Sequence, residues 1–355
     1  MKKKIDYSKQ QTFKAAILIN QLKPLELVHL KFPSRLERGQ VLVKVKKASI
    51  CGAQIGEIDG VKGKDKWLPH CLGHEGYAEV IDKNFEVKTV NIGDEVIMHW
   101  RKGDGIDSSA AKYESSIGLI NAGFVTTFQE YAVVSENRIT ALDDITGIER
   151  IIPLLGCALP TAYGILTKES PLEKEDQILI IGAGGIGMNL GLISKILGSK
   201  KIFLIDKSNY KKRLIDEFGL HFLKASNAKE MTNILGGKKF NKVIDTTGNN
   251  DLISKGFDFL SSNGDLIIVG QPRTGSTLKI YDPIRLFNDG LKIIACDGGD
   301  FNPAKDMQPL IDLVRNKKLE CNRLITHEIP LDQINKGIEV IRSGNAVRVL
   351  ININE

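Results

Sequence analysis

Four side chains with metal-binding chemistry stand close together in the run PHCLGHEG, residues 69–76: two histidines, a cysteine and a glutamate. Thiolates and imidazoles are common zinc ligands. Four neighbours on one short segment cannot converge on a single tetrahedral ion, so a metal site here needs partners from elsewhere in the chain. Without such partners, the cysteine and the histidines are ordinary core residues.

A glycine motif, G-x-G-x-x-G, follows the apolar run at residues 178–182. In nucleotide-binding folds its first glycine permits a tight turn, its second lets the backbone approach a pyrophosphate, and its third lets a helix pack closely on a strand. An acidic residue closes the next apolar run, about twenty residues on, where a carboxylate favours the ribose hydroxyls of NAD over the 2′-phosphate of NADP. A tight turn without a ligand is the alternative. The residues expected to bind NAD are Gly182, Gly184, Gly185, Ile186, Gly187 and Asp206.

Short strands are predicted around the first motif. Residues 40–50, QVLVKVKKASI, alternate apolar and polar side chains and end at Cys51, which predicts a half-buried strand. Similar strands are expected within residues 76–81, 93–100 and 128–134, and together they predict a β-rich, barrel-like domain. Residues 104–121 are rich in small residues and have no clear period, so we expect a surface excursion between strands.

Apolar runs alternate with helical segments after Cys157. Continuous apolar strands spaced by helices predict a parallel sheet that is covered on both faces. The end of the chain, from Ile325, predicts a strand, a helix and a last strand, and its pattern suits either domain. The apolar runs span residues 178–182, 201–206, 242–248, 265–270 and 292–296.

The composition is that of an ordinary folded protein. The chain has 355 residues, more than the roughly 250–300 at which one core stops growing, so two domains are expected. The net charge of +6 comes from scattered lysines and a small basic start, without the dense basic blocks typical of nucleic-acid binding. The apolar run at residues 15–19 is too short for a signal peptide and no stretch approaches a membrane span, so we expect a cytoplasmic protein. The dispersed cysteines form no C-x-x-C pair and indicate individual thiols rather than disulfides.

Several motifs occur in an order that resembles the medium-chain dehydrogenase/reductase superfamily, and specifically its zinc-dependent alcohol and polyol dehydrogenase branch. They are SICGAQ, LPHCLGHEG, VNIGDEVI, FQEYAVV, LLGCALPTAYG, the glycine motif, VIDTTG and SGNAVRVLI. The resemblance implies an α/β protein with a β-rich GroES-like catalytic domain and a Rossmann cofactor domain with a doubly wound parallel sheet. The catalytic domain would comprise residues 1–158 and 299–355, and the NAD-binding domain residues 159–298.

The resemblance also implies a site. Catalytic zinc would be held by Cys51, His74 and Cys157, and Glu75 would be an adjacent carboxylate or an occasional ligand. Two thiolates and an imidazole leave the fourth position of a tetrahedral zinc open, and zinc there lowers the pKa of an alcohol.

Two basic residues match cofactor contacts of the same family. Arg348 would contact the pyrophosphate of NAD, and Lys211 the adenosine ribose. The family's oligomers further imply a homodimer or a homotetramer.

Two departures from the family pattern stand out. Many relatives bind a structural zinc through four cysteines after the GD-V strand, but residues 98–116 contain no cysteine, so one catalytic zinc per subunit is expected. Ala53 and Gly56 stand where relatives place a hydroxyl and a histidine that relay a proton. The candidates that remain for this proton are Glu75, His70, Gln54, His99 and the hydroxyls of the substrate itself.

Trp100 and Arg101 follow the strand at residues 93–100, where relatives line the substrate pocket with an aromatic residue. A guanidinium beside an aromatic ring suits a polyol, a sugar or a sugar phosphate, whereas a solvated basic loop is the plainer interpretation. The expected activity is hydride transfer between a secondary alcohol and NAD. A zinc-free quinone or enone reductase of the same superfamily, and a nucleotide-binding scaffold without catalysis, are the alternatives.

Overall fold

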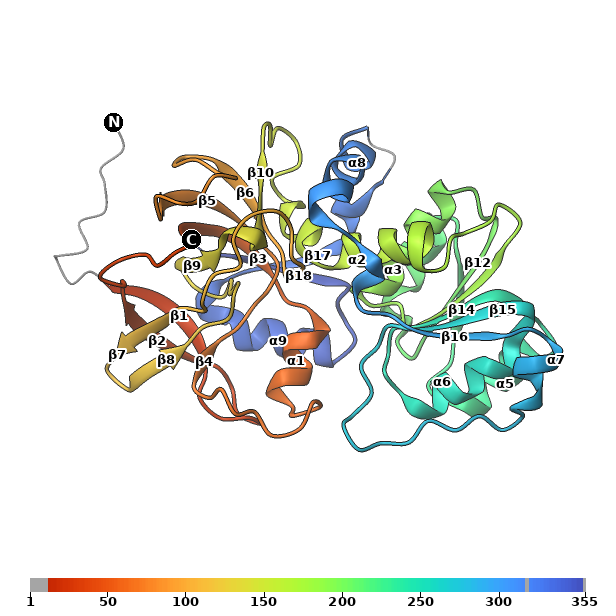
Figure 1. Ribbon diagram of the computed structural model, residues 1–355. Coiled ribbons are helices and arrows are strands. Elements are labelled where there is room, and N and C mark those ends of the chain that lie inside the picture. The colour runs from red at the N-terminus through yellow and green to blue at the C-terminus, as the bar shows by residue number, and fades with distance from the viewer. Residues whose placement is uncertain (1–11, 317–318, 354–355) are drawn as a thin grey trace.

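The protein is described by a computed structural model that covers residues 12–316 and 319–353; the basic start of the chain lies outside these residues. Figure 1 shows two parts side by side, one built mainly of strands and one in which helices flank a parallel sheet. The expected combination of a GroES-like domain with a Rossmann domain is confirmed. Within the described ranges, no helix is both long and apolar enough to cross a membrane.

The strand-rich part contains a closed barrel and a larger, mostly antiparallel sheet. In spatial order the barrel strands are β1 (Thr12–Leu18), β2 (Glu26–Lys31), β7 (Lys112–Ser115), β8 (Gly118–Asn121) and β4 (His70–Cys71). The strands of the larger sheet are β10 (Ile139–Leu142), β6 (Glu95–Met98), β5 (Gly76–Lys83), β3 (Gln40–Ser49), β18 (Arg348–Asn352) and β17 (Ile325–Pro330), and β9 (Tyr131–Ser135) also pairs with β3. The alternation of β3 places its apolar side chains in the core under this sheet.

The last strand of the chain lies in this sheet. β18 pairs antiparallel with β3, with Leu350 opposite Ser49, and parallel with β17. Between β17 and β18, the amphipathic helix α9 (Ile334–Arg342) packs Ile334 and Ile338 into the same core as β3. The last strand of the chain therefore pairs with β3, whereas the first strand, β1, belongs to the barrel.

The prediction for residues 104–121 is wrong in one respect. The segment contains the hairpin β7–β8, and this hairpin is part of the barrel. Tyr113 and Ile120 are fully buried, and the Tyr113 hydroxyl accepts a hydrogen bond from the Val133 N–H. Each strand is four residues long and buries few side chains, too few to produce a visible period.

The second part is a parallel sheet with the strand order typical of dinucleotide-binding folds. Ile178 and Ile180 of its central strand face one core cluster, and Leu179 and Ile181 face another, so both faces are covered. In spatial order the strands are β13 (His221–Lys224), β12 (Lys201–Asp206), β11 (Gln177–Ile181), β14 (Phe240–Asp245), β15 (Leu260–Ile268) and β16 (Lys292–Ala295). The helices near it are α3 (Gly185–Ile196), α4 (Lys212–Glu217), α5 (Ala228–Leu235), α6 (Asn250–Gly256) and α7 (Ile284–Asn288). Between the two parts run α2 (Ala158–Gly164) and α8 (Pro303–Arg315).

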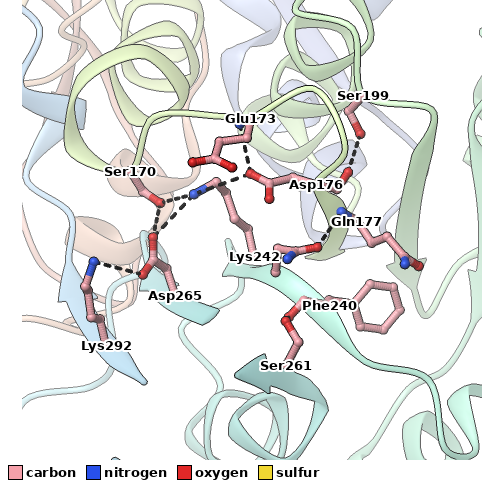
Figure 2. Close-up of polar contacts among 11 residues, drawn as sticks. Ser170, Glu173, Asp176, Gln177, Ser199, Phe240, Lys242, Ser261, Asp265 and Lys292 are labelled. Carbon is pink, nitrogen blue, oxygen red and sulfur yellow. Dashed lines mark hydrogen bonds and ion pairs between the residues drawn. The ribbon is translucent and has the colours of Figure 1, made fainter. Parts of the chain in front are cut away.

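A buried polar network joins the amino ends of these strands (Figure 2). The Lys242 ammonium on β14 lies 2.8 Å from the Ser170 hydroxyl, 3.3 Å from Asp265 and 3.7 Å from Asp176. Paired, hydrogen-bonded charges are the form in which ions are tolerated in an interior. The network ties the segment before β11 to β14 and β15 at the end of the sheet away from the glycine motif.

Glu136 anchors the segment that lacks the structural-zinc cysteines. Its carboxylate is buried and accepts hydrogen bonds from the N–H groups of Lys88, Thr89 and Ile106, at 2.6, 2.9 and 2.8 Å. Burial alone would raise the pKa of Glu136, but the backbone donors and the Thr89 hydroxyl hold it below its ordinary value. One carboxylate thus fixes the segment at residue 106 to the sheet.

We predict that Glu136→Gln lowers the free energy of unfolding by about 1–3 kcal/mol at neutral pH, because the amide NH₂ opposes backbone donors. The advantage of the wild type exists above the unfolded-state pKa of about 4.3 and is lost as the pH falls through the lower folded-state pKa. Urea denaturation at several pH values measures both effects. Glu114→Gln, on the exposed side of β7, is the control and should change stability by less than about 0.5 kcal/mol. Equal stability of Glu136→Gln and wild type at neutral pH would contradict this role.

Candidate active site

Three side chains with soft ligand atoms converge between the two parts of the protein. Cys51 lies where β3 ends and α1 (Gly52–Ile58) begins, His74 lies in the turn between β4 and β5, and Cys157 immediately precedes α2. Their ligand atoms all lie within 4.8 Å of one another. The cluster is the set of zinc ligands that the sequence predicts.

Gly156 allows this convergence. A Cβ atom at this position would lie 2.3 Å from the Met98 carbonyl oxygen and 2.8 Å from the Glu75 Cα, so any larger residue would push the segment away. Because Gly156 packs against Glu75, the next residue, Cys157, comes within reach of His74 and Cys51. The two thiols are 106 positions apart in the chain.

The cluster fits zinc. The Sγ atoms of Cys51 and Cys157 are 4.0 Å apart, and zinc–sulfur bonds of about 2.3 Å in a tetrahedral site place two sulfurs roughly 3.8 Å apart. The Nε2 atom of His74 is buried and has no hydrogen-bond partner within the residues that the structure describes. A buried ring nitrogen without a partner beside two thiols is what a metal ligand requires.

The electrostatics of the two thiols are coupled. The hydrogen bond from Cys157 lowers the pKa of Cys51 well below its ordinary value, and His74 adds to this effect. The pKa of Cys157 is raised, because its thiol serves as the donor and a second thiolate would face the first. Burial acts to lower the pKa of His74, but its contacts with Cys51 and Glu75 raise it overall. One thiolate therefore forms readily, and a dication would stabilise the second.

Glu75 links this cluster to Arg348 on the last strand. Its Oε1 atom lies 2.8 Å from Nη1 of Arg348, and the two side chains are 0% and 3% exposed. Burial raises the pKa of Glu75 to about 7, although the nearby guanidinium opposes that shift. The charges of Glu75 and Cys51 raise the pKa of Arg348 against the effect of its own burial.

Arg348 lies against the first turn of α3. A Cβ atom at Gly185 would lie 2.3 Å from the Arg348 Nε, so the absence of a side chain makes room for the guanidinium. Arg348 Nε and Nη2 are buried and have no partner among the described residues. Two such N–H donors at the start of a helix suit an anionic ligand, since the helix N-terminus also favours negative charge. The pyrophosphate of a dinucleotide fits this position.

The glycine motif has the geometry of a nucleotide-binding turn. Gly182 has a φ of 97°, which favours glycine, and a Cβ atom at Gly187 would lie 1.9 Å from the Gly182 carbonyl oxygen. Gly184 has open space where a side chain would stand. Ile186, in the first turn of α3, is partly exposed.

Asp206 ends β12 beside this turn. Its carboxylate accepts hydrogen bonds from the Ala183 and Ser208 N–H groups, each at 2.9 Å, and its Oδ2 lies 2.9 Å from the Lys211 ammonium. Both charged side chains are almost fully buried. The acid and the base that the sequence assigns to ribose contacts are thus paired with each other.

Thr246 is a residue of the crevice to which sequence reasoning assigned no role. It follows β14, and its hydroxyl donates to the carbonyl oxygens of Ile181 and Gly182, both at 3.0 Å. The preceding Asp245 accepts hydrogen bonds from Thr247 and Gly248 and orders the same loop. The polar residues TTG that end the run at residues 242–248 were the available signal, because ligands bind at the carboxyl ends of such strands where the strand order reverses.

The histidines considered for the proton step are engaged elsewhere. His70 contacts the Asp65 carboxylate and the Cys71 carbonyl oxygen, each at 2.8 Å. His99 contacts the Arg101 carbonyl oxygen and the Thr140 hydroxyl, and burial lowers its pKa to about 4.

Trp100 and Arg101 lie against the connection between the two parts. The Arg101 guanidinium stacks over the Trp100 ring at 5.4 Å, and its Nη1 donates to the Asp297 carbonyl oxygen. Both side chains also lie against Gly298. Arg101 therefore joins the segment after β6 to the segment after β16.

Comparison with known proteins places the chain in a family. Residues 37–144 match the alcohol dehydrogenase GroES-like domain, and residues 185–316 match the zinc-binding dehydrogenase domain. An S-(hydroxymethyl)glutathione dehydrogenase from Paracoccus denitrificans is 24% identical, over 95% of this chain and 99% of its own length. A relative of the same name from Komagataella pastoris is 26% identical, over 96% and 97% of the two chains.

Solved structures show the same fold. A benzyl alcohol dehydrogenase from Acinetobacter calcoaceticus superposes with a TM-score of 0.84 at 24% identity and covers 97% of this chain and 99% of its own. A 2R,3R-butanediol dehydrogenase from Bacillus subtilis gives 0.75 at 21% identity and covers 96% and 100%. With the Cys-His-Cys cluster and both matched domains, these findings show that the chain belongs to the zinc-dependent medium-chain alcohol dehydrogenases.

Proposed function

We propose that the protein transfers a hydride between a secondary alcohol and NAD, with one zinc ion held by Cys51, His74 and Cys157. The observation that carries this proposal is the buried Glu75–Arg348 pair, which connects the metal cluster to the first turn of α3. One end of the pair lies beside the proposed zinc ligands, and the other carries two buried N–H groups without a partner among the described residues, which a pyrophosphate oxygen would satisfy.

Zinc would supply a Lewis acid that lowers the pKa of the alcohol, and NAD would supply the hydride acceptor. The residues of this chain would bind and orient the cofactor. Arg348 would hold the pyrophosphate, and Glu75 keeps the guanidinium in place and balances its charge. Asp206 would accept a ribose hydroxyl at the one lone pair, on Oδ1, that its present contacts leave open, and its negative charge disfavours the 2′-phosphate of NADP. Lys211 contacts the same ribose.

The substrate class in this proposal is a polyol, a sugar or a sugar derivative. Ala53 provides no hydroxyl, and both His70 and His99 already have hydrogen-bond partners, so neither histidine is free to serve as the usual proton relay. A vicinal hydroxyl of the substrate can pass the proton to water instead. Trp100 and Arg101 would give such a substrate a flat face and a planar cation. The named relatives act on chemically different alcohols, so a broad screen is required.

We propose further that residues 1–158 and 299–355 form the catalytic domain and residues 159–298 the NAD-binding domain. The antiparallel pairing of β18 with β3 supports the assignment of the last residues of the chain to the catalytic domain. A cytoplasmic homodimer or homotetramer completes the proposal, on the strength of family resemblance.

The activity test is a spectrophotometric screen of zinc-loaded protein with NAD and a panel of polyols, sugars, sugar phosphates and simple secondary alcohols. We expect NADH formation with at least one polyol or sugar. A strong zinc chelator should abolish turnover, and added Zn²⁺ should restore it, because the open metal position is needed for the alcohol.

Metal analysis of the same preparation should find one zinc per chain, since residues 98–116 contain no cysteine. Turnover that survives complete removal of zinc would contradict the metal-dependent mechanism. Two tightly bound zinc ions per chain would contradict the prediction of one zinc site.

Arg348→Gln tests the cofactor contact. A charge-assisted hydrogen bond is worth about 1.5–3 kcal/mol, so the Kd for NAD should rise by roughly tenfold to a hundredfold or more. Equilibrium fluorescence titration of NADH measures the same contact in the reduced cofactor. Arg342→Gln, whose guanidinium pairs with Asp59 on the surface, is the matched control and should bind as wild type does. Unchanged nucleotide affinity in Arg348→Gln would remove Arg348 from the cofactor site.

A further inference from the structure

Gln54 contacts two parts of the metal cluster at once. It lies on α1, three residues after Cys51, and only 1% of its surface is exposed. Its Oε1 atom accepts a hydrogen bond from the Cys51 N–H at 3.0 Å, and its Nε2 atom contacts Nδ1 of His74. The amide therefore lies between the backbone of one proposed ligand and the ring of another.

These contacts identify which ring nitrogen of His74 faces the metal position. Nδ1 is covered by Gln54, whereas Nε2 is buried without a partner among the residues described. A metal ion would thus bind Nε2, and the neutral imidazole then carries its proton on Nδ1. In the metal-bound protein, both groups that face the Gln54 side chain are N–H donors.

A neutral amide is a poorer acceptor of two hydrogen bonds than a carboxylate is, because only one of its two polar groups can accept. Gln54 offers one oxygen and one NH₂ group, so in either orientation of the amide one N–H faces the NH₂ group unless the side chain turns away. A carboxylate of the same length would accept from both. Carboxylates and carbonyl oxygens that accept from the second ring nitrogen orient a metal-binding histidine and raise its basicity.

We propose that Gln54 is a positioning residue for His74, and that its amide keeps the zinc affinity below the value that a carboxylate at this place would give. The contact still orients the ring, so loss of the polar group weakens binding as well. The inference rests on the metal site in the proposed function. It concerns the strength of metal binding, which is measured without turnover.

The test compares zinc affinities of metal-free protein by competition with a chromophoric chelator. Gln54→Glu should bind Zn²⁺ about tenfold to a hundredfold more tightly than wild type, and Gln54→Met, of similar shape but without hydrogen-bonding groups, at least about tenfold more weakly. A purely structural role would not move the two variants in opposite directions.

Glu57→Gln controls for charge alone. Glu57 lies one turn further along α1, and its charge acts on His74. Its removal should change zinc affinity by less than about threefold, since the charge of this partly exposed side chain acts largely through high-dielectric solvent. A loss of about tenfold or more in Glu57→Gln would show that net charge governs the affinity, and would overturn the proposal.

The remaining outcomes are equally decisive. Zinc affinity of Gln54→Glu within twofold of wild type overturns the proposal. If Gln54→Glu does not fold, Gln54→Met decides: weaker binding supports the role of Gln54, and unchanged binding overturns it. Failure of the wild-type protein to bind one zinc would instead overturn the metal site itself, and the proposed function with it.

Discussion

The buried ion pair between Glu75 and Arg348 is the contact on which the arrangement of the protein depends. Neither side chain is exposed to solvent, and removal of one partner from such a pair leaves an uncompensated interior charge that costs about 3–5 kcal/mol. Glu75 follows the histidine of the metal cluster, and Arg348 lies on the last strand of the chain. The pair therefore requires the end of the chain to return to the sheet that carries the first ligand cysteine.

The same pair explains how two chemically different sites come to face each other. β18 brings Arg348 beside Gly185, in the first turn of α3, and the other side of the guanidinium meets Glu75. At the opposite end of the parallel sheet, the Lys242 network ties three segments together (Figure 2). The sheet is thus held by charges at its amino ends, and its carboxyl ends remain available for a nucleotide.

Local patterns in the sequence predicted much of this architecture. Apolar runs located five of the six strands of the parallel sheet in the described structure, because strands buried on both faces are continuously apolar. The sixth, β13, is a four-residue edge strand with only two apolar side chains, Phe222 and Leu223, and it leaves no such run. The hairpin β7–β8 escaped prediction for a similar reason, because each of its strands is only four residues long.

The sequence was enough to predict the metal ligands of the site, but not the contacts that other side chains make with them. Cys51, His74 and Cys157 follow from the family resemblance that the order of the motifs carries. The pairing of Glu75 with Arg348 joins residues 273 positions apart, and no local period can indicate such a contact. The Gln54 contact with His74 likewise depends on how α1 packs against the turn after β4, and that is a tertiary property.

X-ray absorption at the zinc edge of the purified protein is the most direct measurement of the central claim, that two thiolates and one imidazole hold the metal with one position open. The account predicts two sulfur ligands at about 2.3 Å and two nitrogen or oxygen ligands at about 2.0–2.1 Å, one of them exchangeable. Replacement of Cys157 by Ser should leave one sulfur. A spectrum with four sulfurs, or with none, would contradict the account.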